Sequence, residues 1–371
     1  MVASAKLYKK SSPNDKVTLY MGKREFVDTI TNVEPVDGLV LVNDDYVRSN
    51  RKVFAQLVCH FRYGREQDET MGLNFHKELI LSSQQVYPQQ KIDMDLSKFQ
   101  QNLMEKLGQN AFPFVLEMSP NSPASITLQR KIDDDSEPCG IQYYVKVFAG
   151  NSELEHSNQR STVSMAIQKV QYAPEKQGLK PCTIVRKDFL LSPGQIELEV
   201  NLDKQLYHHG DKIAVNVEIR NNSNKYVKRI KASVKQNVDV LLFQSGQLRN
   251  CISSMETNEG CPIEPGSSLK RVIYLQPNLI PNQNRHGIAV EGNAKKRETS
   301  LASTTLVASP GNRDAFGIIV SYSVKVKLIL CEVGGEVCAE LPFVLMHPNP
   351  SAKKITQEGA NVADEKLIQY E

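Results

Sequence analysis

The sequence Ile196-Glu-Leu-Glu-Val-Asn-Leu202 alternates apolar with polar residues, and Ile213-Ala-Val-Asn-Val-Glu-Ile-Arg220 does the same after a short turn. A period of two residues places one set of side chains on each face of an extended chain, so each stretch predicts a half-buried β-strand. Turn-forming residues follow at Asn221-Asn-Ser-Asn224. Strands that recur about every ten residues between such turns are typical of antiparallel β-sandwiches.

The first half of the chain repeats this style, with one exception at residues 97–107. There Ser97 and Gln100 form a capping box, Phe99, Leu103 and Leu107 share one face, and Gly108 suits the end of a helix. We expect this helix to cover apolar sheet surface. Helices do not alternate with strands elsewhere, which disfavours a parallel nucleotide-binding fold. The other extended segments that the pattern predicts are 17–21, 38–42, 54–60, 126–128, 141–149 and 162–172.

Composition limits the class of protein. The 371 residues are enough for two or three domains, and 45 Lys and Arg against 42 Asp and Glu exclude a global polycation. Any basic site must therefore be local. The seven cysteines lack a Cys-x-x-Cys pair, which favours reduced thiols over a disulfide framework or a zinc cluster. We find neither a signal peptide nor a long apolar run, and we therefore expect a cytoplasmic protein.

Motifs of catalysis are missing from the sequence. Phosphate-loop, nucleophile-elbow and His-Glu-x-x-His patterns do not occur, so the sequence favours a binding protein over an enzyme. The adjacent pair His208-His209 falls at a predicted turn, where neighbouring side chains point in opposite directions, which disfavours joint metal binding. We therefore expect neither a cofactor nor a metal.

Positive charge concentrates in Lys225-Tyr-Val-Lys-Arg-Ile-Lys-Ala-Ser-Val-Lys235. A strand here would turn Arg229, Lys231 and Lys235 away from the core, and no acidic residue alternates with them along the stretch. A solvated strand face and a site for polyanions both fit this pattern. Phosphoinositides or inositol phosphates suit such a patch better than nucleic acid, because interleaved aromatic residues are missing.

A second unusual stretch is Phe61-Arg-Tyr-Gly-Arg-Glu-Gln-Asp-Glu-Thr-Met-Gly-Leu-Asn-Phe75. Two strands that carry aromatic residues flank a charged loop, with glycine at both shoulders and an apolar Met-Gly-Leu near the tip. An ordinary long hairpin and an insertable recognition loop both fit this composition.

Several strings together resemble one family, the arrestins, in order over nearly the whole chain. They are Tyr20-Met-Gly-Lys-Arg-Glu-Phe-Val-Asp28, Val33-Glu-Pro-Val-Asp-Gly38, Phe61-Arg-Tyr-Gly-Arg-Glu66, Lys169-Val-Gln-Tyr-Ala-Pro174, Leu301-Ala-Ser-Thr-Thr305 and Leu345-Met-His-Pro348. Length and the short C-tail make the chain most similar to invertebrate, insect-type visual arrestins. The resemblance implies an all-β fold of two antiparallel, immunoglobulin-like sandwiches with one short helix in the N-domain.

The resemblance also implies the division of the chain. The N-domain would span 1–174, with a finger loop at 63–75 and the helix at 97–107, and a hinge at 175–181 would follow. The C-domain would span 182–350, with a lariat loop at about 281–305, and 351–371 would form the C-tail.

An arrestin is an adaptor and not an enzyme, so the resemblance implies binding to an activated G-protein-coupled receptor, rhodopsin for a visual member, and an end to G-protein signalling. The protein would move from the cytoplasm to the receptor-bearing membrane. A non-visual beta-arrestin that links receptors to clathrin in endocytosis is the near alternative. A trafficking adaptor of the arrestin clan without a receptor partner is another, and a β-sandwich enzyme is disfavoured.

Site residues follow from the resemblance position by position. The finger loop that enters the receptor would use Tyr63, Arg65, Glu66, Asp68, Glu69, Met71, Gly72 and Leu73. Receptor phosphates would contact Lys9, Lys10, Arg24, Lys106 and Lys295. Phosphoinositides or inositol phosphates would contact Lys231, Lys235 and Arg249.

The sequence departs from the family at the polar core, where an arginine pairs with aspartates until phosphate disrupts the pairs. The arginine position here is Gln168, and the matching acids are Glu25, Glu291 and Glu298. A neutral amide cannot form the charge pair whose rupture senses phosphate. We therefore expect binding to depend chiefly on the activated shape of the receptor and little on its phosphorylation.

The tail supports two interpretations. Asp364-Glu-Lys-Leu-Ile-Gln-Tyr-Glu371 aligns with the C-tail strand that lies on the N-domain in the family's basal state. Its last five residues, Leu367, Ile368 and Tyr370 among them, also fit a clathrin box, and one segment could serve both purposes by undocking.

Overall fold

The structure is a computed structural model that describes residues 7–348, apart from 31, 64–75, 90–94, 131–137, 156–157, 175–177, 190–191, 242–245, 284, 292–298, 307–316 and 332–334. Most described residues lie in antiparallel strands, which confirms the all-β prediction. The described chain separates into two compact units. The first contains the residues before 126 together with 140–171, and the second contains 126–139 and the residues from 172 onward.

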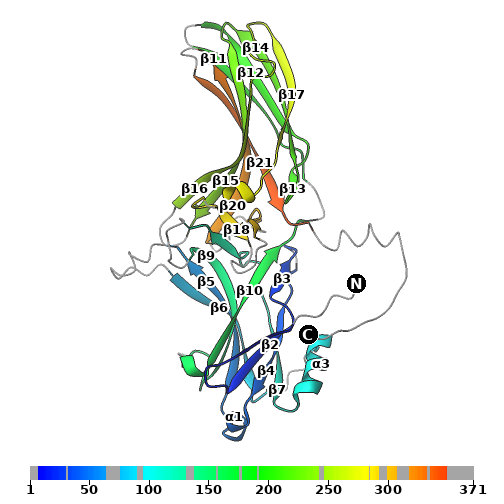
Figure 1. Cartoon of the computed structure of the whole chain (residues 1–371), viewed down its shortest axis with the longest axis vertical. Coiled ribbons are helices and arrows are strands. Elements are labelled where there is room, and N and C mark those ends of the chain that lie inside the picture. Colours follow the sequence, from blue (N-terminus) through cyan, green and yellow to red (C-terminus); the bar gives the residue numbers. More distant parts are fainter. Residues whose placement is uncertain are drawn as a thin grey trace, which may run out of the picture. The chain divides into compact units, whose positions relative to one another are not determined.

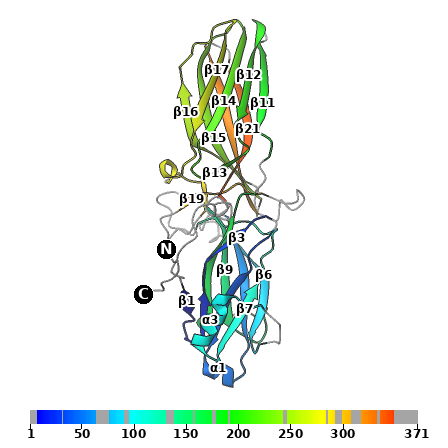
Figure 2. The same cartoon turned by 90° about the vertical axis from the view of Figure 1, so that its right-hand side faces the viewer.

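The first unit is a sandwich of two sheets, seen in Figures 1 and 2. One sheet has the order β1 (Tyr8–Ser11), β2 (Val17–Met21), β4 (Val36–Val42) and β7 (Ala111–Leu116). The other has the order β6 (His76–Tyr87), β5 (Val53–Arg62), β9 (Gly140–Ala149), β10 (Thr162–Gln171) and β3 (Glu25–Asp28), in which β3 and β10 run parallel.

The predicted helix is α3 (Lys98–Leu107), and its capping box is present. The Gln100 amide donates to the Ser97 hydroxyl, and the Gln100 side chain accepts from the Ser97 amide. Leu103 packs with Tyr20 and Leu39, so α3 covers one sheet as expected. A second, five-residue helix, α1 (Asp44–Arg48), was not predicted, because five residues are too few to show helical periodicity.

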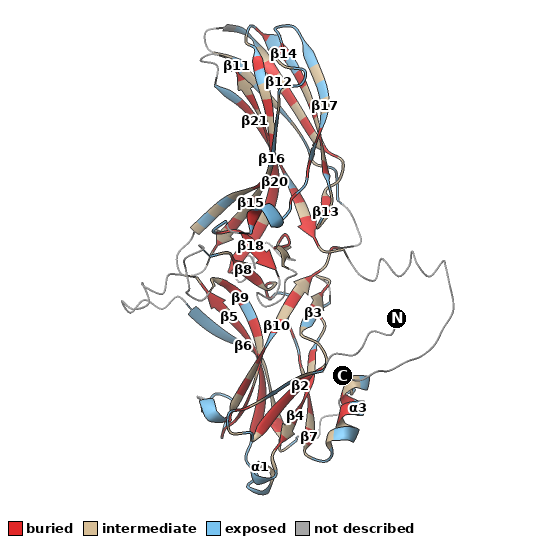
Figure 3. Cartoon of the chain, in the orientation of Figure 1, coloured by how far each residue is buried: buried red, intermediate tan, exposed pale blue. Residues whose placement is uncertain are grey.

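The second unit contains the stretch that decides its fold. The alternating segments form β12 (Ser192–Leu202) and β14 (Ile213–Ser223), in a sheet with the order β11 (Cys182–Phe189), β12, β14 and β17 (Ser268–Leu275). Leu198 pairs with Ile219 and Val200 with Val217, and all four are buried, as Figure 3 illustrates for these strands. The apolar set of each strand therefore faces the core, as the period predicts.

The opposite sheet of this unit has the order β13 (Leu206–His208), β21 (Glu336–Met346), β20 (Ile318–Leu330), β15 (Val227–Val240) and β16 (Gly246–Thr257). Three shorter strands, β8 (Ile126–Leu128), β18 (Ala289–Glu291) and β19 (Ser300–Leu301), pair in that order. Short 3₁₀ turns occur in the first unit at η1 (Gln159–Ser161) and in the second at η2 (Ile280–Asn282).

Candidate functional sites

The basic stretch of the sequence forms the outer side of β15, where Lys231 and Lys235 are partly exposed and the intervening Ala232 and Val234 are buried. On β16, Cys251 pairs with Lys235, and Arg249 lies two residues away on the same side. Residues directly opposite one another in a sheet share a face. The three residues predicted to contact phosphoinositides therefore lie on one face.

Two further lysines join this face from β20. Lys327 pairs with Lys231, and Lys325 pairs with Ser233. Sequence reasoning missed both, although the alternation in Val324-Lys-Val-Lys-Leu328 is itself a signal of outward lysines. We call the set Lys231, Lys235, Arg249, Lys325 and Lys327 the basic face.

Acidic residues also reach the basic face, but from the neighbouring strands. Glu256 on β16 lies 2.6 Å from Arg229 and 4.0 Å from Lys231, and Glu336 pairs with Lys327. The sequence shows no acid within the stretch because these partners come from other strands. They balance only part of the charge, since the structure gives Lys235 and Arg249 no ion pair among the described residues.

Predicted phosphate-binding residues gather on the first unit along β10. Lys10 donates to the Ser164 carbonyl at 2.7 Å, and Arg24 donates to the Ala166 carbonyl at 2.6 Å. Ser164 and Ala166 are two residues apart on β10, so the side chains of Lys10 and Arg24 contact neighbouring positions along that strand. Lys9, the next residue of β1, leaves the opposite face of that strand and is exposed, with its ammonium 5.7 Å from the Tyr20 ring centre.

Lysine and arginine each carry further donors, so Lys10 and Arg24 can bind an anion without giving up these carbonyls. Lys106 lies exposed in the last turn of α3, and Lys295 lies outside the described residues.

The position expected to hold the core arginine lies on β10 beside β3. Gln168 is half-buried and pairs directly with Glu25, and the Gln168 amide donates to the Arg24 carbonyl at 2.7 Å. The side chain opposite Glu25 is therefore a neutral amide. Glu298 lies outside the described residues, and Glu291 belongs to the second unit.

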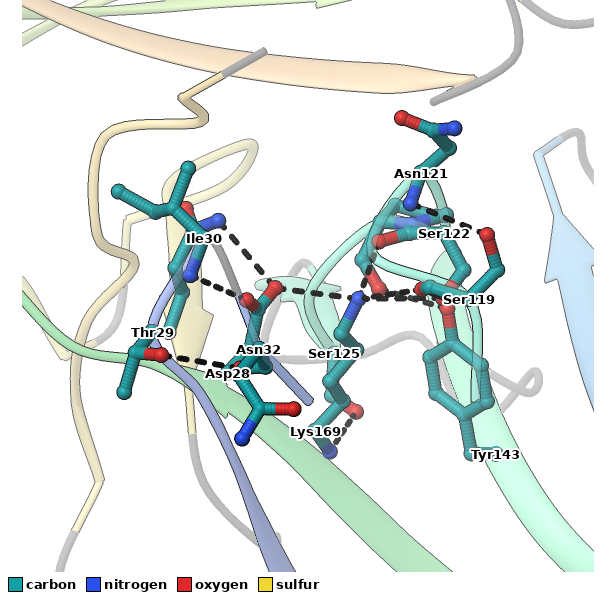
Figure 4. Close-up of polar contacts among 12 residues, drawn as sticks. Asp28, Thr29, Ile30, Asn32, Ser119, Asn121, Ser122, Ser125, Tyr143 and Lys169 are labelled. Atoms are coloured by element: carbon teal, nitrogen blue, oxygen red, sulfur yellow. Dashed lines mark hydrogen bonds and ion pairs between the residues drawn. The ribbon is translucent and has the colours of Figure 1, made fainter. Parts of the chain in front are cut away.

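The next residue, Lys169, forms a buried ion pair that the sequence did not indicate (Figure 4). Its ammonium is fully buried and lies 3.1 Å from the carboxylate of Asp28 on β3. It also donates to the Ser122 carbonyl at 2.5 Å, to the Ser122 hydroxyl at 3.1 Å and to the Ser119 carbonyl at 3.3 Å. The ammonium thus has oxygen partners on two segments, as a buried cation requires.

The Asp28 carboxylate also accepts hydrogen bonds from donors other than Lys169. It accepts from the Ile30 amide at 2.6 Å and from the Gln171 side chain at 3.3 Å. Burial lowers the pKa of the Lys169 ammonium, an effect that the Asp28 charge opposes. Burial also raises the pKa of the nearby Cys59 thiol to about 12. The one feature of the sequence that could have indicated this ion pair is a lysine at a core-facing position of a strand.

In the second unit, Glu291 at the end of β18 is 3% exposed. One carboxylate oxygen accepts from the Ser303 amide, and the other lies 2.8 Å from Nε2 of His347. The His209 ring lies tilted against the His347 ring, with 4.4 Å between their centres. Burial, followed by the neighbouring His347, lowers the pKa of His209 to about 4.

Other predicted residues lie outside the described chain. Of the finger loop only Tyr63 is described, and the tail residues Leu367, Ile368 and Tyr370 are not. Within the described residues, no group of three or more His, Cys, Asp or Glu side chains is arranged to hold a metal ion. The described helices include none with the length and apolar character needed to cross a membrane.

Two sandwiches of mainly antiparallel strands, the ten-residue helix α3 on the first and cationic surfaces on both define the class of an adaptor with the arrestin fold. Comparison with known families supports this class over most of the chain. Residues 17–173 match the family described as arrestin (or S-antigen), N-terminal domain, and residues 192–350 match the corresponding C-terminal domain. The chain therefore belongs to the arrestin family, as the sequence motifs predicted.

Its relatives include insect proteins that match over nearly their full length. Phosrestin-2 of Drosophila melanogaster is 63% identical, with 97% of this chain and 99% of the relative covered. Phosrestin-2 of Calliphora vicina is 64% identical, with 95% of this chain and 97% of the relative covered. An arrestin homolog of Heliothis virescens is 58% identical, with 96% of this chain and 93% of the relative covered.

The protein is a receptor-binding adaptor that terminates signalling by G-protein-coupled receptors, and it is not an enzyme. The insect relatives do not favour the non-visual alternative.

Proposed function

We propose that this arrestin binds light-activated rhodopsin in photoreceptor cells and does so with little dependence on receptor phosphorylation. The observation that carries the proposal is Gln168, a neutral amide directly opposite Glu25 at the position where the family holds an arginine. An incoming phosphate can break a charge pair, but it has little to break between an amide and a carboxylate. The basal state should therefore open without phosphate.

The buried charges nearby do not replace the missing sensor. Lys169 is fully buried and already holds Asp28 and the segment 119–122, so a phosphate at the surface has no access to it. Lys9, Lys10 and Arg24 remain at the surface and supply direct contacts that favour a phosphorylated receptor modestly. Phosphate thus acts as an added contact and not as a trigger.

Co-sedimentation with rhodopsin membranes tests this proposal. Wild-type protein should sediment with light-activated membranes whether or not the receptor is phosphorylated, and should stay in solution with dark membranes. Gln168→Arg adds the missing charge, so it should lower binding to the unphosphorylated active receptor and spare the phosphorylated one. Gln168→Leu adds no charge and serves as the matched control. A large phosphate preference in the wild type would refute the proposal.

The basic face supports a second binding function, for the phosphate groups of phosphoinositides or inositol phosphates. Basic residues near an anionic surface contribute about 1 kcal/mol each. Replacing both Lys231 and Lys235 by Gln should therefore weaken binding to vesicles that contain phosphatidylinositol bisphosphate by about 30-fold. Lys270→Gln removes an exposed lysine from the other sheet and should change little. Equal losses in the two variants would contradict a local site.

The remaining parts of the proposal concern regions given by the sequence. Residues 63–75 would form the finger loop that enters the receptor cavity, 175–181 the hinge, and 351–371 a tail that either lies on the first unit or binds clathrin. A peptide of residues 351–371 should bind the clathrin terminal domain more tightly than its Leu367→Ala variant if the clathrin function exists. Equal binding removes clathrin as a partner. The protein would work in the cytoplasm at the receptor-bearing membrane.

A further inference from the structure

His347 makes two contacts that together close one corner of the second unit. Its Nε2 lies 2.8 Å from the Glu291 carboxylate and 3.3 Å from the Ser300 hydroxyl. Glu291 is the last residue of β18, and Ser300 is the first residue of β19. Those two residues pair directly across the two strands. One imidazole nitrogen therefore contacts both strands, at the end of β18 and the start of β19.

The main chain fixes His347 in this place. His347 follows β21 directly, and its carbonyl accepts from the Ala173 amide at 3.0 Å. Tyr172 forms a parallel bridge with it. The His209 amide donates to the Met346 carbonyl at 3.2 Å, so His209 follows β13 alongside His347. The strand register thus fixes the backbone position from which the His347 ring projects.

The chemistry of the partners assigns the proton. A carboxylate can only accept hydrogen bonds, so a hydrogen bond from His347 to the Glu291 carboxylate requires the hydrogen on Nε2. The other Glu291 oxygen accepts from the Ser303 amide, which follows β19. His209 does not compete for Glu291, because its Nε2 lies 3.3 Å from the Ser303 hydroxyl. The groups that face the His347 ring are thus Glu291, Ser300, Tyr172 and His209.

We propose that His347 is a positioning residue, whose Nε2–H ties Glu291 of β18 and Ser300 of β19 to the end of β21. We call these contacts of His347 with Glu291 and Ser300 the clasp. The clasp holds the end of β18, at residue 291, and the start of β19, at residue 300. Lys295 and Glu298, two of the residues predicted for the receptor-phosphate site and the polar core, belong to the stretch between them. Glu291 thereby has a hydrogen-bond donor within its own unit. The family resemblance assigns the role of partner to an arginine at the position of Gln168.

Amide hydrogen exchange in the full-length protein tests the clasp without any receptor, so the result is independent of the proposed function. The Ser303 amide reports the Glu291 carboxylate directly, and the β18 and β19 amides report their pairing. His347→Leu removes the donor and should speed exchange of the Ser303 amide by about tenfold or more, as expected for loss of a buried charged-group hydrogen bond. His347→Gln retains a donor and should restore most of the protection.

His208→Leu is the matched control, because His208 is the last residue of β13, directly before His209, and pairs with Asp211 instead of Glu291. It should leave Ser303 exchange unchanged. The proposal is overturned if His347→Leu exchanges like the wild type at Ser303, or if Gln and Leu at position 347 behave alike.

A second measurement needs no variant and covers the case in which His347→Leu does not fold. In the ¹⁵N spectrum of the wild-type histidine rings, His347 should carry a protected proton on Nε2. An unprotonated Nε2 at neutral pH, with the proton on Nδ1, would equally overturn the clasp, because such a nitrogen cannot donate to Glu291.

Discussion

Replacing Lys169 by Met should destabilise the first unit more than almost any other single change to its charged residues. The substitution preserves much of the side-chain volume but removes the only cation within reach of Asp28 among the described residues. Asp28 would keep the Ile30 amide and the Gln171 side chain as donors, while its charge would lose its counter-ion in a site that is 1% exposed. Breaking a buried ion pair in this way costs about 3–5 kcal/mol.

The oxygens that Lys169 holds add to this cost. The Ser122 carbonyl, the Ser122 hydroxyl and the Ser119 carbonyl would each lose a donor, although the Ser122 hydroxyl still donates to the Ser119 carbonyl. A domain is stable by only about 5–15 kcal/mol, so the variant should be close to unfolding at moderate temperature. Removing both charges, with Asp28→Leu and Lys169→Met, should cost clearly less than the sum of the two single changes.

Hydrogen exchange by peptide mass spectrometry is the appropriate assay, because the chain has no tryptophan and two units. A loss of 3–5 kcal/mol corresponds to exchange about 100 to several thousand times faster in β3 and β10. Peptides of the second unit should not change and serve as an internal reference. Lys77→Met, at an exposed lysine of the same unit, is the matched control. Equal exchange rates in Lys169→Met and Lys77→Met would refute a stabilising role for the Lys169–Asp28 ion pair.

Three further predictions concern capping and titration. Ser97→Ala should destabilise α3 by about 1 kcal/mol or somewhat more, because it removes the cap and a hydrogen bond to Asp37, and a lower thermal midpoint would show it. His209 is neutral when folded, so acidification from pH 6.5 towards 4 should cost about 3 kcal/mol, and His209→Gln should flatten that slope in pH-dependent urea unfolding. Cys59, with its pKa raised to about 12, should react with iodoacetamide at pH 8 far more slowly than exposed Cys182, and mass spectrometry of the labelled peptides would detect the opposite order of reaction rates. The contribution of the Cys59 thiol to stability should decrease only above pH 9, the pKa of the thiol in the unfolded chain.

The sequence predicted features that depend on neighbours along the chain. The period of two residues in 196–202 and 213–220 set which side chains of β12 and β14 face the core, and the structure has that register. The capping box at Ser97 marked the start of α3, because its two hydrogen bonds join residues three apart. The period of two residues likewise predicted which lysines of β15 point away from the core.

Features that join distant segments were not visible from the sequence. Nothing in the chain indicates that Glu256 on β16 faces Arg229, or that Lys325 and Lys327 lie beside the basic stretch, since strand order decides both. The sequence disfavoured joint metal binding by His208 and His209, but it could not show that His209 lies beside His347, a partner more than a hundred residues away. Adjacent strand residues point in opposite directions, so the useful partner of a histidine lies across a sheet.

The sequence by itself determined the sandwich class, the helix, the family and the absence of charge at Gln168, because these depend on local periodicity and on residue identity. Only the tertiary structure decided where the compensating charges lie. Lys169 meets Asp28 across the parallel pairing of β10 with β3, and Glu291 meets His347 where β18 approaches the end of β21. The physical reason is that a buried charge must find an opposite charge or a donor nearby in space, and the sheets bring such partners together from distant positions of the chain.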